Sequence, residues 1–273
     1  MTPYFVNLPL GYAFQGMYID LFLEQKVCPE LGLEGVDLED PAVFKRIENM
    51  AGRIREAGLV CSVHLPWTGL SMFAHGASLE SRLDAASRAL EAAQAFNPVR
   101  LVAHPDIPSG SLEERRADVG LCAELWRRVA ETWPGHPPLA LENTFEDDPR
   151  TLAALAAEID RADVGLCFDV GHWRAFARGA VRKNLSVWME TLAPYLSHVH
   201  LHDNNGWEDE HLGLGAGGVD WGEFAEALAF AVGPVTAALE PHSLKDYNTT
   251  LRYLEGNPMI LSRIEPARHI DRP

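Results

Sequence analysis

Histidine and carboxylate residues recur in this chain directly after short apolar runs. The segments are Val63-His64-Leu65-Pro66, His104-Pro105, Glu142-Asn143, Asp169-Val170-Gly171-His172, His198-Val199-His200-Leu201-His202-Asp203 and Glu240-Pro241-His242. A mixed set of imidazole and carboxylate ligands suits Zn²⁺, Mn²⁺, Fe²⁺ or Co²⁺ rather than Ca²⁺. If the fold brings these residues together, they would form a site for a transition metal.

The candidate ligands number nine, which is more than one ion needs. They are His64, His104, Glu142, Asp169, His172, His200, Asp209, His211 and Glu240. Asp209 and His211 are two positions apart, so both side chains can face one way in an extended loop. A single histidine after a strand is more often a capping or core group, but the same coincidence at six strand ends favours metal binding. We expect one to three divalent ions per chain, with Zn or Mn preferred.

The strands and helices that would position these residues alternate regularly along the sequence. Short apolar runs predict eight strands, with a helical pattern in most of the gaps between them. The predicted strands are Tyr4–Leu8, Gly35–Leu38, Leu59–Leu65, Val99–His104, Leu139–Asn143, Val164–Asp169, His198–Asp203 and Val235–Glu240. Strands that alternate with helices imply a parallel sheet. Eight such units predict an α/β fold, a single (β/α)₈ TIM barrel domain over residues 1–273, whose active site lies where the strands end.

Helix starts support this count. Asp40-Pro41 and Asp148-Pro149 each place a capping acid before a proline at the first helical position. Between Ser78 and Phe96, small and apolar residues recur every three to four positions, which predicts one apolar helix face. Asn97-Pro98 should end that helix.

Composition narrows the class of protein. The chain has 273 residues, 47% of them hydrophobic, and a formal net charge of −16. This composition excludes a disordered chain and disfavours nucleic acid as a partner, because a broad basic surface is absent from the sequence. No apolar stretch approaches the roughly 18 residues of a membrane span, and the N-terminus lacks a signal-peptide pattern. The four scattered cysteines suit buried thiols. We therefore expect a cytoplasmic protein with a small-molecule substrate and no membrane partner, and leave open a homo-oligomer.

The order and spacing of the segments resemble the xylose isomerase-like TIM barrel superfamily. This superfamily includes sugar isomerases and epimerases and the endonuclease IV type of apurinic endonuclease, AP endonuclease family 2. The resemblance covers Leu59 to Glu240 and includes Cys167-Phe168-Asp169-Val170-Gly171-His172 and Asp209-Glu210-His211-Leu212-Gly213. In the isomerases and epimerases, the positions matching Glu142, Asp169, His200 and Glu240 usually hold one divalent ion. In the endonuclease branch, all nine candidate positions hold three zincs.

Two reactions are consistent with this resemblance. In a sugar or sugar-phosphate isomerase or epimerase, the ion binds two adjacent oxygens of a hydroxy-ketone and lowers the cost of an enediolate. Glu142 and Glu240 would then exchange the proton, while His172 or His202 positions hydroxyl groups. In a multi-zinc phosphodiesterase, a metal-bound hydroxide would attack a phosphodiester, and Glu142 would bridge two metals or handle the water.

Other features favour the isomerase or epimerase, and with it a role in carbohydrate metabolism. The apurinic enzymes carry an Arg- and Gln-rich loop after the second strand, where this chain has the acidic Leu38-Glu39-Asp40-Pro41. Trp67 stands where those enzymes place a tyrosine that enters DNA, and no Lys and Arg run accompanies it. The alternative is a phosphodiesterase acting on abasic DNA or a small phosphodiester. A metal-binding protein without catalysis is the third interpretation.

Five further residues are candidates for substrate binding. Trp67, Trp173 and Trp207 are expected in loops of the active face, where an aromatic ring can wall a pocket, and ordinary packing is the competing interpretation. Arg174 is the best candidate cation for a substrate phosphate, and His202 for a substrate hydroxyl. The glycine-rich run Gly213 to Gly218 matches a dinucleotide-binding pattern but does not directly follow a strand in a βαβ unit, so we interpret it as loop geometry.

Overall fold

Eight parallel strands form the centre of the fold in the computed structural model, which describes residues 3–67, 70, 78–105, 107 and 112–266. Each strand pairs with its neighbour in sequence, and β8 pairs with β1 to close the barrel. The strands are β1 (Phe5–Pro9), β2 (Cys28–Gly32), β3 (Ser62–His64), β4 (Arg100–Ala103), β5 (Leu139–Glu142), β6 (Val164–Asp169), β7 (Leu196–Leu201) and β8 (Thr236–Leu239). The predicted (β/α)₈ barrel is confirmed.

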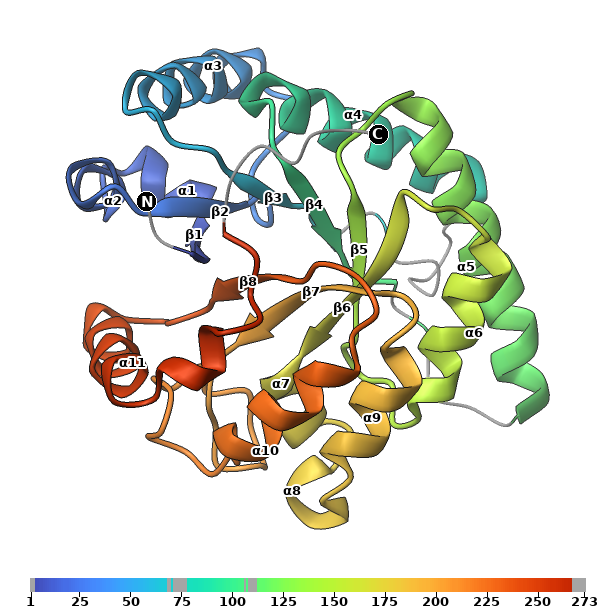
Figure 1. The fold of residues 1–273 in the computed structure, drawn as a ribbon. Helices are drawn as coiled ribbons and strands as arrows, with labels where there is room; N and C mark the ends of the chain where they lie inside the picture. The colour runs from blue at the N-terminus through green and yellow to red at the C-terminus, as the bar shows by residue number, and fades with distance from the viewer. Residues whose placement is uncertain (1–2, 68–69, 71–77, 106, 108–111, 267–273) are drawn as a thin grey trace.

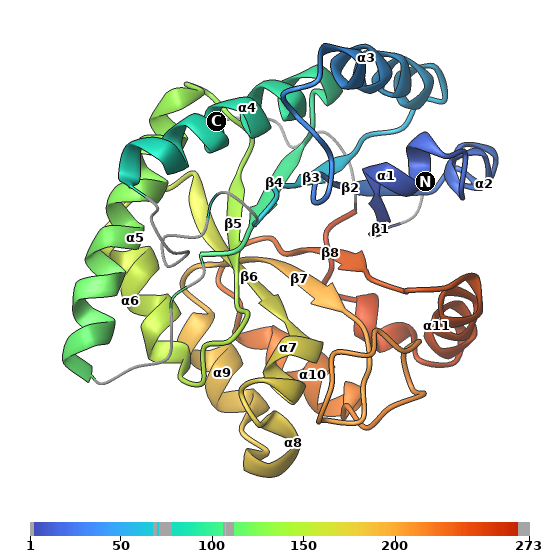
Figure 2. The same cartoon turned by 180° about the vertical axis from the view of Figure 1, so that it is seen from behind.

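Helices surround the barrel, as two opposite views show (Figures 1 and 2). They are α1 (Leu10–Phe14), α2 (Ile19–Gln25), α3 (Pro41–Glu56), α4 (Leu79–Phe96), α5 (Leu112–Thr132), α6 (Pro149–Ile159), α7 (Val170–Ala175), α8 (Gly179–Arg182), α9 (Leu185–Leu192), α10 (Trp221–Ala227) and α11 (Leu244–Gly256), with short 3₁₀ turns η1 (Leu228–Phe230) and η2 (Pro258–Leu261). None of these described helices is long and apolar enough to cross a membrane.

The helix starts lie where the capping residues predict them. The Asp40 side chain accepts a hydrogen bond from Ala42 N at 2.8 Å, and Asp148 accepts one from Arg150 N at 3.0 Å. Ser78 caps α4 reciprocally with Ser81. Each cap satisfies an amide at a helix start that has no partner inside its helix, so the first turns of α3, α4 and α6 are set locally by the sequence.

The second strand is the one clear error of the sequence prediction. The pattern predicts a strand at Gly35–Leu38, but these residues lie in the turns that follow β2, and the strand is Cys28–Gly32. Proline and a charged residue are unfavourable inside a strand, so Pro29 and Glu30 hide this segment from a search for apolar runs. Both faces of the strand are buried by the rest of the barrel, which overrides that local preference.

Alternation along the strands divides the barrel into an apolar outside and a polar interior. The apolar core lies between the strands and the helices, and includes Val63, Leu101 and Phe168. Successive side chains along a strand point to opposite faces of the sheet. The residues directly before and after Val63, Leu101 and Phe168 in the sequence therefore face the barrel axis. The interior contains a small separate apolar cluster, Val102, Ala140 and Cys167. Buried polar and charged residues occupy much of the remaining interior. All four cysteines are buried, as expected.

Candidate metal centre

Three carboxylates and one histidine meet at the ends of strands β5 to β8. We call Glu142, Asp169, His200 and Glu240 the inner cluster. One ligand atom from each lies within 4.8 Å of the others. His200 Nδ1 lies 3.2 Å from Glu142 Oε1, 3.3 Å from Glu240 Oε1 and 3.7 Å from Asp169 Oδ2. Residues far apart in the sequence are thus brought to one point, because parallel strands end on the same side of the barrel.

The inner cluster fits a divalent cation. All four residues are buried, and buried carboxylates are costly unless a positive charge compensates them. His200 Nδ1 is buried and makes no well-aligned hydrogen bond with the described residues, although it faces all three carboxylates. Oxygen and nitrogen ligands in this mixture suit Zn²⁺ or Mn²⁺.

The electrostatics of the inner cluster show how strongly it attracts positive charge. Burial lowers the pKa of His200, but the nearby acidic groups, Cys167 and Glu142 first, raise it well above its ordinary value. Burial raises the pKa of Glu142, but His200 and His104 outweigh it and hold that pKa well below the usual range. The pKa of Glu240 is raised, chiefly by burial. The cluster therefore favours an ionised Glu142 carboxylate beside a positive charge, which is a protonated His200 when no ion is bound.

A second group lies at the rim of the barrel beside the inner cluster. We call His172, His202, Asp209 and His211 the outer cluster, and their ligand atoms also lie within 4.8 Å of one another. Asp209 Oδ2 is 3.3 Å from His172 Nε2 and 3.0 Å from His211 Nε2. His202 Nε2 is 3.1 Å from Asp169 Oδ1, which links the two clusters. The rings of His202 and His211 stack with centroids 3.9 Å apart.

Two further histidines reach Glu142 from β3 and from the residue after β4. Glu142 Oε2 is 2.9 Å from His64 Nε2 and 3.2 Å from His104 Nε2. Its other oxygen, Oε1, is 3.1 Å from His172 Nδ1. Glu142 therefore contacts both clusters. The structure places all nine candidate ligands in one connected group, and it adds His202, which the sequence assigns to substrate hydroxyls.

The local geometry around β5 and β6 keeps these side chains in place. Asn143 Oδ1 accepts from Asp169 N at 2.8 Å, and its Nδ2 donates to Asp169 O at 3.0 Å. Asp169 also caps α7 by accepting from His172 N at 2.6 Å. A Cβ at Gly171 would collide with the His202 ring, so only glycine permits this close approach. These contacts fix the separation of the two clusters.

The glycine-rich loop Gly213 to Gly218 is held by one buried acid. Asp203 accepts hydrogen bonds from Gly215 N, Val219 N and Trp221 Nε1, each at 3.1 Å. The loop precedes α10 and closes back onto the end of β7 through the Asp203–Leu212 bridge. Its glycines serve loop geometry, in agreement with the sequence analysis.

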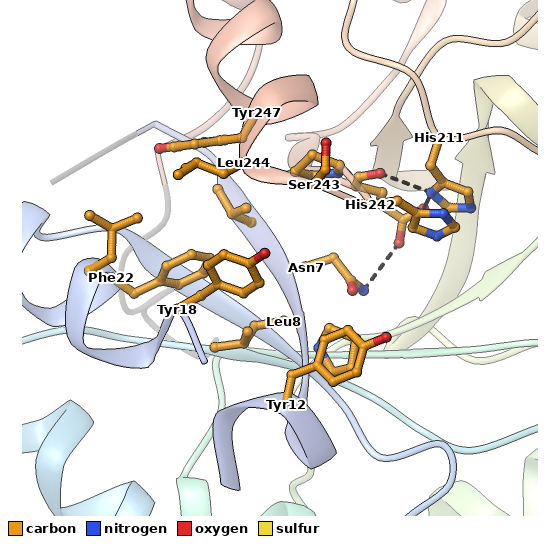
Figure 3. A pocket seen from close by; sticks show the side chains of 15 residues that line it. Asn7, Leu8, Tyr12, Tyr18, Phe22, His211, His242, Ser243, Leu244 and Tyr247 are labelled. Carbon is orange, nitrogen blue, oxygen red and sulfur yellow. Dashed lines mark hydrogen bonds and ion pairs between the residues drawn. The ribbon is translucent and has the colours of Figure 1, made fainter. Parts of the chain in front are cut away.

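A cavity of about 380 Å³ opens beside the inner cluster. Glu240 and His211 line it together with residues of β1 and with apolar and aromatic side chains of α1, α2 and α11. Figure 3 shows this cavity, with Asn7, Leu8 and His211 among the labelled side chains. Asn7 Nδ2 donates to Glu240 Oε1 at 3.3 Å, and His242 stacks on His211 with centroids 3.8 Å apart. The volume falls in the range of small-ligand sites, about 300–1,000 Å³.

Four of the predicted substrate contacts do not line this cavity: Trp67, Trp173, Arg174 and Trp207. Trp173 is buried, and its Nε1 donates to Asn184 Oδ1 at 3.2 Å. Arg174 Nε donates to the Asn204 carbonyl at 3.1 Å. Trp67 and Trp207 are 48% and 79% exposed.

Sequence reasoning misses several polar residues of this region. Asn7 is hidden inside an apolar strand, and Glu30 inside a segment without a strand-like pattern. His202 is named by the sequence analysis for substrate hydroxyls, and its place among the possible ligands also carries a signal, because it lies two positions after His200 and therefore on the same face of the chain as it leaves β7. His242, which the sequence marks only as part of a strand end, stacks on the outer cluster.

Comparisons with known proteins agree with this geometry. The model of the family described as xylose isomerase-like TIM barrel matches residues 26–256. The chain belongs to this family. Among proteins of known sequence, it is 35% identical over 82 residues to the uncharacterized protein MJ1311 of Methanocaldococcus jannaschii. That stretch is 29% of this chain and 26% of the relative, so the match spans about a quarter of that protein's length.

Two solved structures have the same fold over nearly their whole length. The TTHB071 protein from Thermus thermophilus, soaked with ZnCl₂, is 25% identical with a TM-score of 0.71, over 93% of this chain and 97% of its own. A D-tagatose 3-epimerase-like protein is 22% identical with a TM-score of 0.71, over 96% of this chain and 98% of its own. The chain therefore has the same barrel fold as these two proteins.

Proposed function

We propose that this member of the xylose isomerase-like TIM barrel family is a divalent-metal-dependent isomerase or epimerase of sugars or sugar phosphates. The observation that carries this proposal is the inner cluster, in which three buried carboxylates surround the orphaned Nδ1 of His200. The likeness to a D-tagatose 3-epimerase-like protein supports a sugar as the substrate class.

Glu142, Asp169, His200 and Glu240 would hold the ion. When bound, a divalent cation supplies a Lewis acid that polarises adjacent oxygens of a hydroxy-ketone and lowers the cost of removing the neighbouring carbon-bound proton. Asn143 makes two hydrogen bonds to the Asp169 backbone, and the Asp169 carboxylate accepts one from His172 N, so the carboxylate is oriented before substrate arrives. This preorganisation is the main contribution of the rigid strand ends.

Glu142 and Glu240 are our candidates for moving the proton. They come from different strand ends, β5 and β8, and approach His200 Nδ1 at similar distances, 3.2 and 3.3 Å. Glu142 is the carboxylate whose environment favours the ionised form, and burial favours the protonated form of Glu240. One carboxylate can thus take a proton at its Oε atom while the other returns one, with Asn7 orienting Glu240.

The cavity beside Glu240 is our candidate for the substrate pocket. Tyr12, Tyr18, Phe22 and Tyr247 supply aromatic side chains, and Asn7 and His242 supply polar groups near the inner cluster (Figure 3). Sugar rings have apolar faces that pack on aromatic rings, with hydroxyls at the edge that need polar partners. No Lys or Arg lines this described cavity, which favours an uncharged sugar over a sugar phosphate bound here.

The direct test is metal content together with proton exchange. Protein purified without added metal should contain at least one transition metal per chain. With Mn²⁺ or Zn²⁺ and a panel of ketohexoses in D₂O, NMR should show deuterium entering at the carbon beside the carbonyl. A metal-free preparation with full activity would overturn the proposal, as would a metal-loaded enzyme that exchanges no proton on any sugar of the panel.

The alternative function is a multi-zinc phosphodiesterase, which one observation favours. His64 and His104 both contact Glu142, and the outer cluster adds four more ligand residues, so the site offers more ligands than one ion uses. Glu142, His64 and His104 would then help to hold a second ion. The acidic turns after β2, which include Glu34, Asp37 and Glu39, oppose an approach to DNA.

Metal count and substrate separate the two functions. Three ions per chain and cleavage of bis-p-nitrophenyl phosphate or an abasic duplex would support the phosphodiesterase. One ion and exchange on a keto sugar would support the isomerase. A filled site with no turnover on either set of substrates would indicate a binding role.

A further inference from the structure

Polar and ionisable residues also lie inside the barrel, one layer below the inner cluster. Glu30 on β2, Ser62 on β3 and His198 on β7 are all fully buried. His198 precedes His200 by two positions, so both point to the barrel axis at successive depths. Barrel interiors of this fold are usually filled by layers of apolar side chains, and a buried carboxylate is costly unless it is paired. A buried Glu30 therefore calls for a reason other than packing.

Glu30 is held on both of its oxygens. Oε1 lies 3.0 Å from His200 Nε2. Oε2 accepts a hydrogen bond from Ser62 Oγ at 2.7 Å and lies 3.3 Å from His198 Nε2. His198 is anchored in turn, because its Nδ1 lies 2.6 Å from Thr236 Oγ1. The carboxylate is thus fixed by three strands beneath a candidate metal ligand.

The two nitrogens of the His200 ring face different carboxylates. Nδ1 faces Glu142, Asp169 and Glu240 of the inner cluster, and Nε2 faces Glu30. Neither nitrogen has a hydrogen-bond partner of good geometry among the described residues, so the nearest polar groups to the ring are these carboxylates on its two sides. A histidine that binds a metal through one nitrogen usually donates the proton of the other to a carboxylate, which fixes its tautomer and orientation.

We propose that Glu30 is a positioning residue that accepts the Nε2 proton of His200 and so presents the Nδ1 lone pair to the ion held by the inner cluster. This inference rests on the proposed metal site and assigns a role below it to a residue that is not itself a ligand. Ser62 and His198 aim Glu30 at the ring.

A second ion in the interior is the competing interpretation. Cys167, His198 and His200 have ligand atoms within 4.8 Å of one another, and Glu30 lies beside them. In that arrangement Glu30 would be a ligand, and its removal would lower the number of bound ions. In our proposal its removal lowers the affinity and leaves the number unchanged.

The experiment compares Zn²⁺ affinity, by competition with a chromophoric chelator, in the wild type and in Glu30→Gln. The matched control is Glu146→Gln, which alters another buried carboxylate. Glu146 accepts from Thr144 N at 2.6 Å and from Ile107 N at 3.3 Å, and these two backbone amides belong to no candidate ligand. We expect Glu30→Gln to weaken binding about 10- to 100-fold with an unchanged ion count, and the control to stay within about twofold.

Ser62→Ala keeps the test decisive if Glu30→Gln does not fold. It removes one hydroxyl that anchors Glu30 and should weaken Zn²⁺ binding about fivefold. The Nε2 proton of His200 in the Zn²⁺-loaded protein, followed by ¹⁵N NMR, should shift in each variant and stay unchanged in Glu146→Gln. A purely structural role for Glu30 would not move that resonance selectively.

Each outcome separates this inference from the proposed function. If the wild type binds no divalent ion, the proposed function fails and this inference fails with it. If the wild type binds Zn²⁺ and Glu30→Gln or Ser62→Ala binds it within twofold, only the role of Glu30 is overturned. If Glu30→Gln loses one ion per chain, Glu30 is a ligand and the positioning role is overturned.

Discussion

The inner and outer clusters use the same residue types but lie in different surroundings. In the inner cluster, the side chains of His200 and Asp169 are 0% exposed and that of Glu142 is 1% exposed. In the outer cluster, the side chain of His211 is 13% exposed and that of Asp209 is 24% exposed. The inner cluster is built from strand ends, and the outer one draws Asp209 and His211 from the loop after β7.

This difference suggests different tasks. Three of the four inner residues are at most 1% exposed, and only Glu240 reaches the cavity, so we expect an ion there to exchange with solvent more slowly than an ion at the rim. The outer cluster can meet its charge internally, because the contacts of Asp209 with His172 and His211 form ion pairs without a metal. Substitution, metal removal and pH each affect the two clusters differently.

Glu142→Gln should have the largest effect, because Glu142 contacts both clusters. The substitution removes a negative charge that faces His64, His104, His172 and His200. We expect sugar proton exchange to fall by at least about 10³-fold, as for loss of a general base combined with a metal ligand. Glu146→Gln is the control and should retain near wild-type exchange. An active Glu142→Gln enzyme would contradict its place at the centre of the site.

Metal removal should lower the free energy of unfolding, and most of this loss should come from an ion that leaves the inner cluster. An ion at a hundredfold excess over its dissociation constant stabilises the folded state by about 2.7 kcal/mol. For a domain of this size, that corresponds to a fall of about 5–10 °C in Tm on chelation. Asp169→Asn should abolish this difference in calorimetry, and Asp209→Asn should largely preserve it. The reverse pattern would place the tightly bound ion at the rim.

The outer cluster should give the metal-free protein a pH-dependent stability. Burial lowers the pKa of His211, but the contact with Asp209 and the charge of Glu240 outweigh it and raise that pKa to about 9. A histidine with a raised pKa stabilises the fold fully below its unfolded value of about 6.5 and loses this contribution as pH rises through the folded value. Urea unfolding should therefore show a loss on the order of 1–3 kcal/mol from pH 6.5 to above pH 9.

Asp209→Asn should flatten that dependence, because it removes the partner that raises the pKa of His211. Asp220→Asn is the control: Asp220 caps α10 by accepting from Glu223 N, outside both clusters. It should lower stability at every pH and leave the slope unchanged. An unchanged slope in Asp209→Asn would show that the outer cluster does not carry this effect.

The sequence predicts the site better than it predicts one of the strands that supports it. Ligands such as Glu142 and Asp169 directly follow apolar runs, so their place at strand ends follows from local pattern. Glu30 cannot be found in this way, because its strand contains Pro29 and no apolar alternation. Only closure of the barrel, which no local window contains, buries that segment and places Glu30 under His200.

Tertiary packing also decides the fate of the predicted aromatic contacts. Trp173 and Trp207 both follow strand ends at the active face, and nothing local distinguishes them. The structure buries Trp173 near Phe168 and leaves Trp207 exposed. The pocket aromatics Tyr12 and Tyr18 come from the first βα unit, which carries no metal-ligand motif and therefore no signal in the sequence.

His64→Ala and His104→Ala should have the smallest effect if the inner cluster alone holds the ion. Both histidines contact Oε2 of Glu142, whereas His200 contacts Oε1. Their side chains are 15% and 21% exposed, so alanine leaves space that water can fill. We expect sugar proton exchange to fall less than about tenfold in either variant, since no ligand of the inner ion is lost. A phosphodiesterase with further ions on Glu142 Oε2 would instead lose at least about 10³-fold. The same two substitutions thus decide whether the inner cluster alone performs the chemistry or whether further ions beside His64 and His104 are needed.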